Sequence, residues 1–155
     1  MSYVREGGGL FTQRTARENL RLRTHSCRDA RVLLPRYPTL EAIADRRVGL
    51  LSGGEQQLLA VACVLSVEPR LLLIDEMAMG LSTVAVKQPP ALVRDAADQG
   101  VAVLLVERHV QDTLRFADRA CVLRHGEPVA QGTSEQLTEP LEAPRDSYFD
   151  MSSPR

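Results

Sequence analysis

The sequence predicts an α/β protein in which short strands alternate with helices and pair in parallel. Three apolar runs, at 71–74, 101–106 and 120–123, have the length and composition of strands. A helical stretch over about 90–99 separates the first two runs and ends at Gly100, a residue type that commonly follows the last turn of a helix. Strand, helix, strand in that order is typical of a layered parallel sheet.

The composition is that of a globular chain forming one compact domain or part of a larger protein. Its 155 residues are 44% apolar and 25% charged, which is enough to bury a core and excludes wholesale disorder. The longest apolar run, 58–65, is far shorter than the ~18–20 residues that span a bilayer, so we expect no membrane span. No secretory signal is visible at the N-terminus, so we expect the chain in the cytoplasm.

The charges are unevenly distributed although the net charge is only −1. Residues 1–50 hold ten arginines against five acids, whereas the rest of the chain holds nine basic residues against fifteen acids. The excess of arginine in the first third suits an acidic partner or has no role in binding. Among partners, we expect no nucleic acid. Lys87 is the only lysine, which matters because phosphate-binding loops commonly need one.

The cysteines and histidines are too scattered to indicate a metal centre or a disulfide framework. Cys27, Cys63 and Cys121 show no C-x-x-C spacing, and the three histidines stand equally far apart. We expect buried, reduced thiols, because free cysteine is among the most often buried residue types.

The first part of the chain predicts a loop followed by short helices. Residues 1–14 have the character of a loop, because three successive glycines at 7–9 are too flexible for the interior of an element. Thr15 and Glu18 have the spacing of a capping box, which predicts a helix through about Arg23. Residues 24–50 predict one or two further helices, broken by prolines, with a packing face of Leu40, Ile43 and Ala44.

The last part of the chain predicts a hairpin and a final helix. A turn at 125–127 connects the third strand to a further short strand at 129–130, and 132–135 has the pattern of a helix start. The segment 139–155 contains several prolines, and we expect it to be a loose tail.

The run Leu-Ser-Gly-Gly-Glu-Gln-Gln at 51–57 is the most informative stretch of the chain. Ser52 and Glu55 form a second capping box, which predicts a helix over about 53–66 with unpaired amides at its N-terminus. Gly53 and Gly54 let a ligand approach the backbone, and the helix dipole favours an anion there. The residues alone leave two interpretations open, a phosphate site or a helix that is simply well capped.

Two carboxylates, Asp75 and Glu76, follow the strand at 71–74. Ligands of open α/β sheets bind at the carboxyl edge of the strands. One carboxylate at that edge suits Mg²⁺, and the next suits a water that attacks a phosphoryl group. The alternative is a pair of solvated acids that end a strand.

These two stretches together resemble the signature motif and the Walker B motif of ATP-binding-cassette (ABC) ATPases. The similarity extends over nearly the whole chain: 3–6 and 10–11 resemble the Q-loop region, 17–20 the entry to the helical subdomain and 80–82 the D-loop. The stretches 117–119 and 122–126 resemble the closing strands. Within the family, 75–81, 106–110 and the Glu at the Q-loop position look most like subunits that energise branched-chain amino-acid import.

The resemblance implies ATP and Mg²⁺ as cofactors and a head-to-tail dimer that docks beneath a membrane permease, on the inner face of the cell membrane. It implies that Ser52, Gly53 and Gly54, with Glu55 beside them, touch the γ-phosphate held by the partner. It implies that Asp75 lies in the Mg²⁺ shell and that Glu76 orients or activates the attacking water. It also implies that Glu6 is the Q-loop sensor, with Arg108 at the switch position and His109 beside it.

The phosphate loop of the family, G-x-x-x-x-G-K-[ST], is not found in these 155 residues. In the family that loop precedes the Q-loop, so we expect the chain to be the C-terminal part of a longer protein. The expected divisions are a Q-loop region at 1–14, a helical subdomain at 15–66, part of the α/β core at 67–138 and the tail. By itself the chain is not expected to hydrolyse ATP, because phosphate positioning supplies most of such catalysis.

Two functions of different classes are compatible with these features. One is the ATP-hydrolysing subunit of an importer, or its C-terminal fragment. The other is a non-catalytic interaction module that acts on an intact ATPase or a permease. DNA-repair and chromosome ATPases share the signature helix, but the short spacing between Ser52 and Asp75 and the lack of Cys pairs disfavour them. A parallel sheet without its first strands has an unpaired edge, so we also expect poor solubility.

Overall fold

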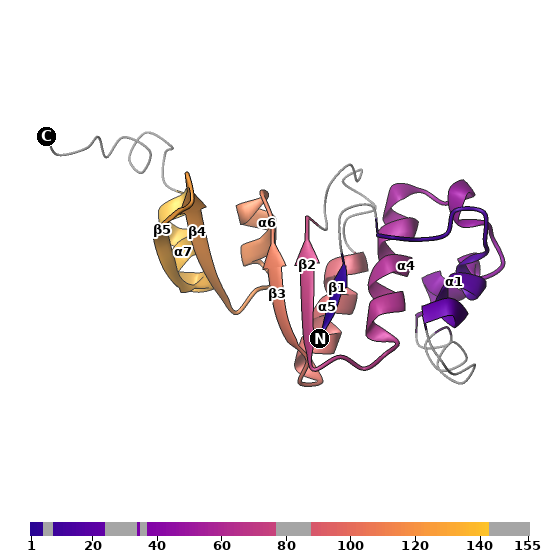
Figure 1. Cartoon of the computed structure of the whole chain (residues 1–155). Coiled ribbons are helices and arrows are strands. Elements are labelled where there is room, and N and C mark those ends of the chain that lie inside the picture. Colours follow the sequence, from indigo (N-terminus) through magenta and orange to yellow (C-terminus); the bar gives the residue numbers. More distant parts are fainter. Residues whose placement is uncertain (5–7, 24–33, 35–36, 77–87, 143–155) are drawn as a thin grey trace, which may run out of the picture. The chain divides into compact units, whose positions relative to one another are not determined.

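The computed structural model describes residues 1–4, 8–23, 34, 37–76 and 88–142. These residues form an α/β fold, as predicted, that divides into two compact units, Met1–Glu107 and Arg108–Arg155 (Figure 1). Glu6, the D-loop stretch 80–82, Cys27 and Lys87 lie outside the described residues.

The first unit contains a three-stranded parallel sheet. Strands β1 (Ser2–Val4), β2 (Leu71–Asp75) and β3 (Ala102–Val106) lie in that order, and helix α5 (Gln88–Asp98) connects β2 to β3. The strands predicted at 71–74 and 101–106 and the helix between them are therefore confirmed. Gly100 ends the helix in a left-handed conformation with φ +94°, and the Val101 amide bonds back to the Ala96 carbonyl at 3.1 Å.

Strand β1 corrects the prediction that all of residues 1–14 form a loop. It contains only three residues, and its partner β2 lies about seventy positions further along the chain, with Tyr3 opposite Leu73. So short a segment gives almost no periodic signal by itself, because the pairing that makes it a strand is not local. Val4 is 1% exposed and anchors the strand in the core.

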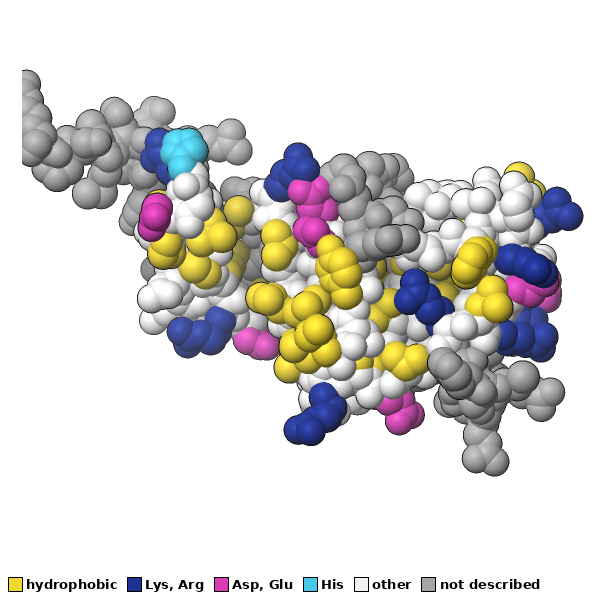
Figure 2. Space-filling view, viewed as in Figure 1, with side chains coloured by type: hydrophobic (Ala, Val, Ile, Leu, Met, Phe, Trp, Pro, Cys, Tyr) yellow, Lys and Arg dark blue, Asp and Glu magenta, His cyan; other side chains and the backbone are white. Residues whose placement is uncertain are grey.

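A continuous apolar run such as 71–74 is typical of a strand buried on both faces, but the sheet does not have that burial pattern. Along β2 the side chains of Leu72 and Ile74 are buried and those between them are only half-buried, and along β3 alternate side chains are exposed. The described helices therefore cover one face. The opposite one, here called the open sheet face, consists of Tyr3, Leu71, Leu73, Asp75, Ala102, Leu104 and Val106. Figure 2 shows apolar side chains gathered over these strands.

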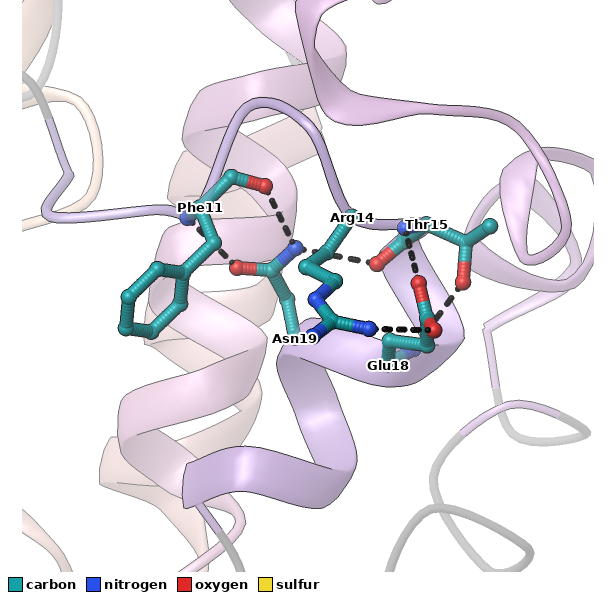
Figure 3. A network of polar contacts seen from close by, with 5 residues as sticks. All are labelled: Phe11, Arg14, Thr15, Glu18 and Asn19. Carbon is teal, nitrogen blue, oxygen red and sulfur yellow. Dashed lines mark hydrogen bonds and ion pairs between the residues drawn. The ribbon is translucent and has the colours of Figure 1, made fainter.

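The helices of the first unit start where the capping signals predict. The Thr15 hydroxyl accepts the Glu18 amide and Glu18 accepts the Thr15 amide, at 3.1 and 2.8 Å, so α1 (Ala16–Arg23) begins with the predicted capping box (Figure 3). Helix α3 (Pro38–Ile43) and the 3₁₀ turn η1 (Val48–Leu50) follow. The predicted packing face is confirmed, since Leu40, Ile43 and Ala44 are at most 2% exposed.

Helix α4 (Gly53–Leu65) forms the centre of the first unit. Every residue from Leu58 to Val64 is buried, so the helix is apolar around its whole circumference. It contacts α1 and α3 on the one hand and β1 and α5 on the other. Helix α4 therefore packs both on the preceding helices and on elements of the sheet layer. The subdomain boundary expected near residue 66 stays a prediction.

A loop residue fixes the chain against α4. Gly8 has φ +66°, and a Cβ built on it would lie 2.8 Å from the Ala60 Cβ. Both the backbone conformation and the close approach therefore require glycine at this position.

A buried amide holds the next part of the same loop. Asn19 on α1 is 2% exposed; its Oδ1 accepts the Phe11 amide at 2.8 Å, and its Nδ2 donates to the Phe11 carbonyl at 3.0 Å (Figure 3). The same Nδ2 also donates to the Thr15 carbonyl at 2.9 Å. These bonds tie the loop before α1 to the helix itself.

The second unit contains α6 (Val110–Leu114), an antiparallel hairpin of β4 (Arg119–Arg124) and β5 (Glu127–Thr133), and α7 (Ser134–Glu142). The predicted turn is confirmed, with positive φ at both His125 and Gly126, as hairpin turns that match strand twist require. Helix α7 continues to Glu142, four residues into the segment expected to be loose. Its first turn is capped by Thr133, which explains the start at the predicted position.

The cysteine prediction is confirmed in part. Cys63 is buried in α4, whereas Cys121 on the hairpin is exposed, because alternate residues of β4 face outward. Within the described ranges, no helix has the length and apolar character needed to cross a bilayer.

Candidate functional site

The N-terminus of α4 is built by the predicted capping box. Ser52 lies in extended conformation; its Oγ accepts the Glu55 amide at 3.3 Å, and the Glu55 Oε2 accepts the Ser52 amide at 2.7 Å. The Ser52 carbonyl already accepts the Gln56 amide at 2.9 Å. The Ser52 oxygen therefore acts as an acceptor within the cap.

Two backbone amides at this helix end are left for a ligand. In the described part of the chain, the amides of Gly53 and Gly54 have no hydrogen-bond partner, as expected for the first turn of a helix. Ser52 and Gly53 are exposed, whereas Gly54 is buried against the chain. A phosphate would therefore meet the serine hydroxyl and the Gly53 amide first.

Glu55 is held by a positive neighbour as well as by the cap. Arg46 Nη1 lies 2.8 Å from Glu55 Oε1, and Arg46 Nη2 donates to the Leu50 carbonyl at 3.0 Å. Burial by itself raises the pKa of Glu55, but hydrogen bonds from Ser52 and the charge of Arg46 outweigh that effect and leave the pKa below its ordinary value. Glu55 is therefore ionised at neutral pH and holds the loop in front of the helix.

The Walker B candidates lie at the carboxyl end of β2, as predicted. Asp75 is the last residue of the strand, and its Oδ2 accepts the Tyr3 hydroxyl at 3.1 Å. Glu76 follows with φ +50°, and its amide donates to the Val106 carbonyl on β3 at 3.0 Å. Few residues other than glycine adopt such a left-handed conformation, and those that do occur often at functional sites.

The two candidate regions lie at the same end of the first unit. The chain descends along α4 and returns upward along β2, so the helix N-terminus and the strand carboxyl end share one side (Figure 1). The geometry brings Ser52, Gly53, Asp75 and Glu76 to that side.

The donor set at the β2 edge fits magnesium. Carboxylate oxygens are hard ligands, and Mg²⁺ is usually held by one or two carboxylates together with phosphate oxygens and waters. Within the described ranges no group of three or more His, Cys, Asp or Glu side chains could hold a metal without such help. Asp75 therefore suits a metal that arrives with a nucleotide.

The remaining site candidates in the described residues belong to the second unit. Arg108 and His109 are exposed at the start of the second unit, where the His109 carbonyl accepts the Thr113 hydroxyl at 3.0 Å at the beginning of α6. Sequence reasoning missed Tyr3 as a partner of Asp75. The only available signal was an aromatic residue in a segment that we expected to be a loop.

Comparison with known proteins defines the class. The family model described as ABC transporter matches residues 1–79, just over half of the chain. The chain therefore belongs to the ABC transporter family.

Its relatives have different transport roles. It is 36% identical over 156 residues to the high-affinity branched-chain amino acid transport ATP-binding protein BraG of Pseudomonas aeruginosa. This match covers 96% of this chain and 66% of BraG. It is 31% identical over 100 residues to the lipopolysaccharide export system ATP-binding protein LptB of Acidithiobacillus ferridurans, covering 64% of this chain and 42% of LptB. The chain thus spans no more than about two thirds of these relatives.

The fold is that of solved ATP-binding cassettes. A dimeric cassette in a post-hydrolysis state, bound to ADP and phosphate, superposes with a TM-score of 0.69 at 23% identity, over 86% of this chain and 62% of the cassette. CbiO1 of Clostridium perfringens, part of an ABC transporter complex, superposes with a TM-score of 0.75 at 19% identity, over 91% of this chain and 60% of CbiO1.

Proposed function

We propose that this chain supplies the signature helix and the Walker B edge of an ATP-hydrolysing ABC transporter subunit. The observation that carries the proposal is the common orientation of the α4 N-terminus and the β2 carboxyl end in one compact unit (Figure 1). Both ends have the chemistry that phosphates and their metal require, and they lie in a chain of this family.

At the signature helix, the Ser52 hydroxyl and the Gly53 and Gly54 amides would donate to the γ-phosphate of a nucleotide bound by a second ATPase subunit. Glu55 acts within the chain instead. It accepts the Ser52 amide and pairs with Arg46, so it holds the donors in place. The helix dipole adds to the attraction, because its positive end faces the anion.

At the Walker B edge, Asp75 would hold Mg²⁺ and Glu76 would orient the attacking water. The metal, when bound with the nucleotide, neutralises charge that develops on the phosphates. The backbone at Glu76 is left-handed, directly after the end of β2. Glu6, Arg108 and His109 are proposed, from the resemblance alone, as the nucleotide sensor and the switch position with its neighbour.

The proposed partners are a second ATPase subunit, bound head to tail, and a permease beneath which both dock at the inner face of the membrane. The proposed solute is a branched-chain amino acid. The residues at 75–81 and 106–110 and the 36% identity to BraG support it, although LptB, a match of similar identity, belongs to an export system.

The test is equilibrium binding of a fluorescent ATP analogue with Mg²⁺. The purified chain is titrated alone and together with an intact ABC ATPase that carries a P-loop. We expect no saturable binding to the chain alone up to millimolar nucleotide, because these 155 residues contain no P-loop run. With the intact ATPase, we expect added chain to increase analogue binding, and Ser52→Arg in the chain to abolish the increase.

The controls separate the two ends of the site. Asp75→Asn is the matched variant at the Walker B edge; it leaves the signature helix intact and should keep the increase. Loss of the increase in both variants would indicate a general folding defect. Micromolar binding to the chain alone that depends on Asp75 would show that a nucleotide site exists without a P-loop. It would overturn the proposal that this chain contacts a nucleotide held by a second ATPase.

The non-catalytic alternative is examined in the same mixture. In that alternative, the chain acts only through another ATPase. If it does, ATP turnover by the intact ATPase will change with added chain, whereas Glu76→Gln in the chain will have no effect on that turnover. Loss of turnover in Glu76→Gln would instead assign the chemistry to this chain.

A further inference from the structure

We propose that Tyr3 is a positioning residue for Asp75: its hydroxyl fixes one oxygen of the carboxylate and leaves the other for the metal. The inference rests on the proposed function, because it concerns the carboxylate assigned to Mg²⁺. The hydroxyl oxygen of Tyr3 lies 3.1 Å from Asp75 Oδ2. The Tyr3 hydroxyl donates this bond, and the carboxylate oxygen accepts it.

The sheet register explains why these two side chains meet. Tyr3 lies opposite Leu73 on the neighbouring parallel strand, and Asp75 is two residues further along the same face. An aromatic side chain is long enough to reach such a diagonal neighbour. The contact is therefore a consequence of the pairing of β1 with β2.

Tyr3 is well suited to hold a carboxylate still. Its backbone belongs to a paired strand, and the next residue, Val4, is buried at 1% exposure. A tyrosine side chain has only two rotatable bonds before the ring, so little freedom remains once the strand is fixed. Asp75 is the last residue of its strand, and no other hydrogen bond to its carboxylate is found among the described residues.

The chemistry at the carboxylate follows from this bond. With Oδ2 occupied by the hydroxyl, Oδ1 is the oxygen without a partner in the described part of the chain. Hydrogen bonds from outer groups orient metal ligands, and their removal commonly weakens metal binding by ~10–100-fold. Tyr3 is 50% exposed, so water competes for the bond. We therefore expect an effect at or below the low end of that range, about 3- to 10-fold.

The test uses Mn²⁺ alone as the probe, without nucleotide. Paramagnetic broadening of the side-chain carboxyl ¹³C resonances reports weak metal binding at single carboxylates in the full chain. We expect the Asp75 resonance to broaden at lower Mn²⁺ than that of Asp98, which is paired with Arg94 at 2.6 Å. Tyr3→Phe, which keeps the ring and removes the hydroxyl, should raise the Mn²⁺ needed to broaden Asp75 by about 3- to 10-fold.

The matched control is Tyr37→Phe, the same chemical change at the N-cap of α3. It should leave the Asp75 titration unchanged. If Tyr3→Phe also leaves it unchanged while Asp75 still broadens first, Tyr3 does not position the carboxylate, and the proposed function stands. If Asp75 broadens no earlier than Asp98 in the unaltered chain, both the metal assignment and the role of Tyr3 are wrong.

A second measurement on the unaltered chain does not depend on any variant folding. Exchange of the hydroxyl proton for deuterium shifts the ¹³C resonance of a carboxylate that accepts the hydrogen bond. We expect this isotope shift at Asp75. Its absence would overturn the proposal, whatever the variants show.

Discussion

The contact of Gly8 with the signature helix gives a prediction whose size can be worked out from the structure. The change is Gly8→Ala. The left-handed φ of +66° costs an alanine ~1–2 kcal/mol. The new Cβ would also lie 2.8 Å from the Ala60 Cβ, closer than such atoms approach, so α4 or the loop must move. Overpacking of this kind costs ~1–3 kcal/mol, so the total loss of folding free energy should be ~2–5 kcal/mol.

The assay is equilibrium unfolding in urea, followed by circular dichroism. Gly100→Ala is the matched control, because Gly100 also has positive φ, at +94°, but has nothing within 4 Å of an added Cβ. It should lose only the conformational part, ~1–2 kcal/mol. Gly8→Ala combined with Ala60→Gly should recover part of the loss, since that change removes the opposing methyl group. A cost for Gly8→Ala no larger than that for Gly100→Ala would refute the close packing of this loop on α4.

Three further predictions concern stability, reactivity and solubility. Glu55→Ala should cost about 1 kcal/mol through the lost cap, measured by thermal unfolding at pH 7, and an unchanged Tm would contradict the capping box. The pKa of Glu55 is lowered in the folded chain. The stabilisation by its carboxylate is therefore complete above the ordinary Glu pKa of ~4.3 and is lost as the pH falls through the lower pKa of the folded chain. The difference in unfolding free energy between Glu55→Gln and the unaltered chain should therefore shrink in acid. Burial raises the pKa of Cys63 to about 12, whereas Cys121 is exposed. Iodoacetamide at pH 8 should therefore label Cys121 and leave Cys63 unlabelled until the chain unfolds, as measured by peptide mass spectrometry. Equal labelling rates would contradict the packing of α4. Leu104 on the open sheet face is 60% exposed, and Leu104→Glu should reduce aggregation in light scattering, whereas the same change at buried Leu72 should increase it.

The features that the sequence predicts well are those encoded by neighbouring residues. The capping boxes at Thr15 and Ser52 each involve two side chains three positions apart, and both form as expected. The stop at Gly100 depends on one residue's tolerance of positive φ. The strand at 71–74 is a continuous apolar run. Each of these signals is complete within a few residues, so no knowledge of the rest of the fold is needed.

The features that the sequence does not predict depend on distant partners. Tyr3 acquires its role only because β1 pairs with β2, about seventy residues away. The neighbouring residues of Gly8 indicate only one of three flexible glycines, whereas its tight contact is with Ala60 on α4. The apolar residues on both faces of β2 and β3 predict a sheet covered twice, but the described helices cover only one face. In the first two cases the deciding contact is with residues far along the chain, and in the third it is the packing of helices on one face of the sheet.

In the candidate site too, the sequence predicts the features encoded by neighbouring residues better than those that depend on the fold. Ser52, Gly53, Gly54, Asp75 and Glu76 could be found because each motif is a short contiguous run next to a helix start or a strand end. Their placement on one side of the first unit follows from the return of the chain from α4 into β2 (Figure 1). The left-handed conformation of Glu76 has no sequence signal, because glutamate seldom adopts it.

The most direct test of the proposed function is the response of the Gly53 and Gly54 amides to a nucleotide. The chain is labelled with ¹⁵N-glycine and mixed with an intact ABC ATPase that carries a P-loop, and the two amide resonances are followed during addition of a non-hydrolysable ATP analogue with Mg²⁺. If these amides contact a γ-phosphate, they will shift with the ATP analogue and not with ADP, while Gly126 in the hairpin turn stays unchanged. Resonances of Gly53 and Gly54 that ignore the analogue, in a mixture where the ATPase has bound it, would contradict the assignment of this helix end to the nucleotide.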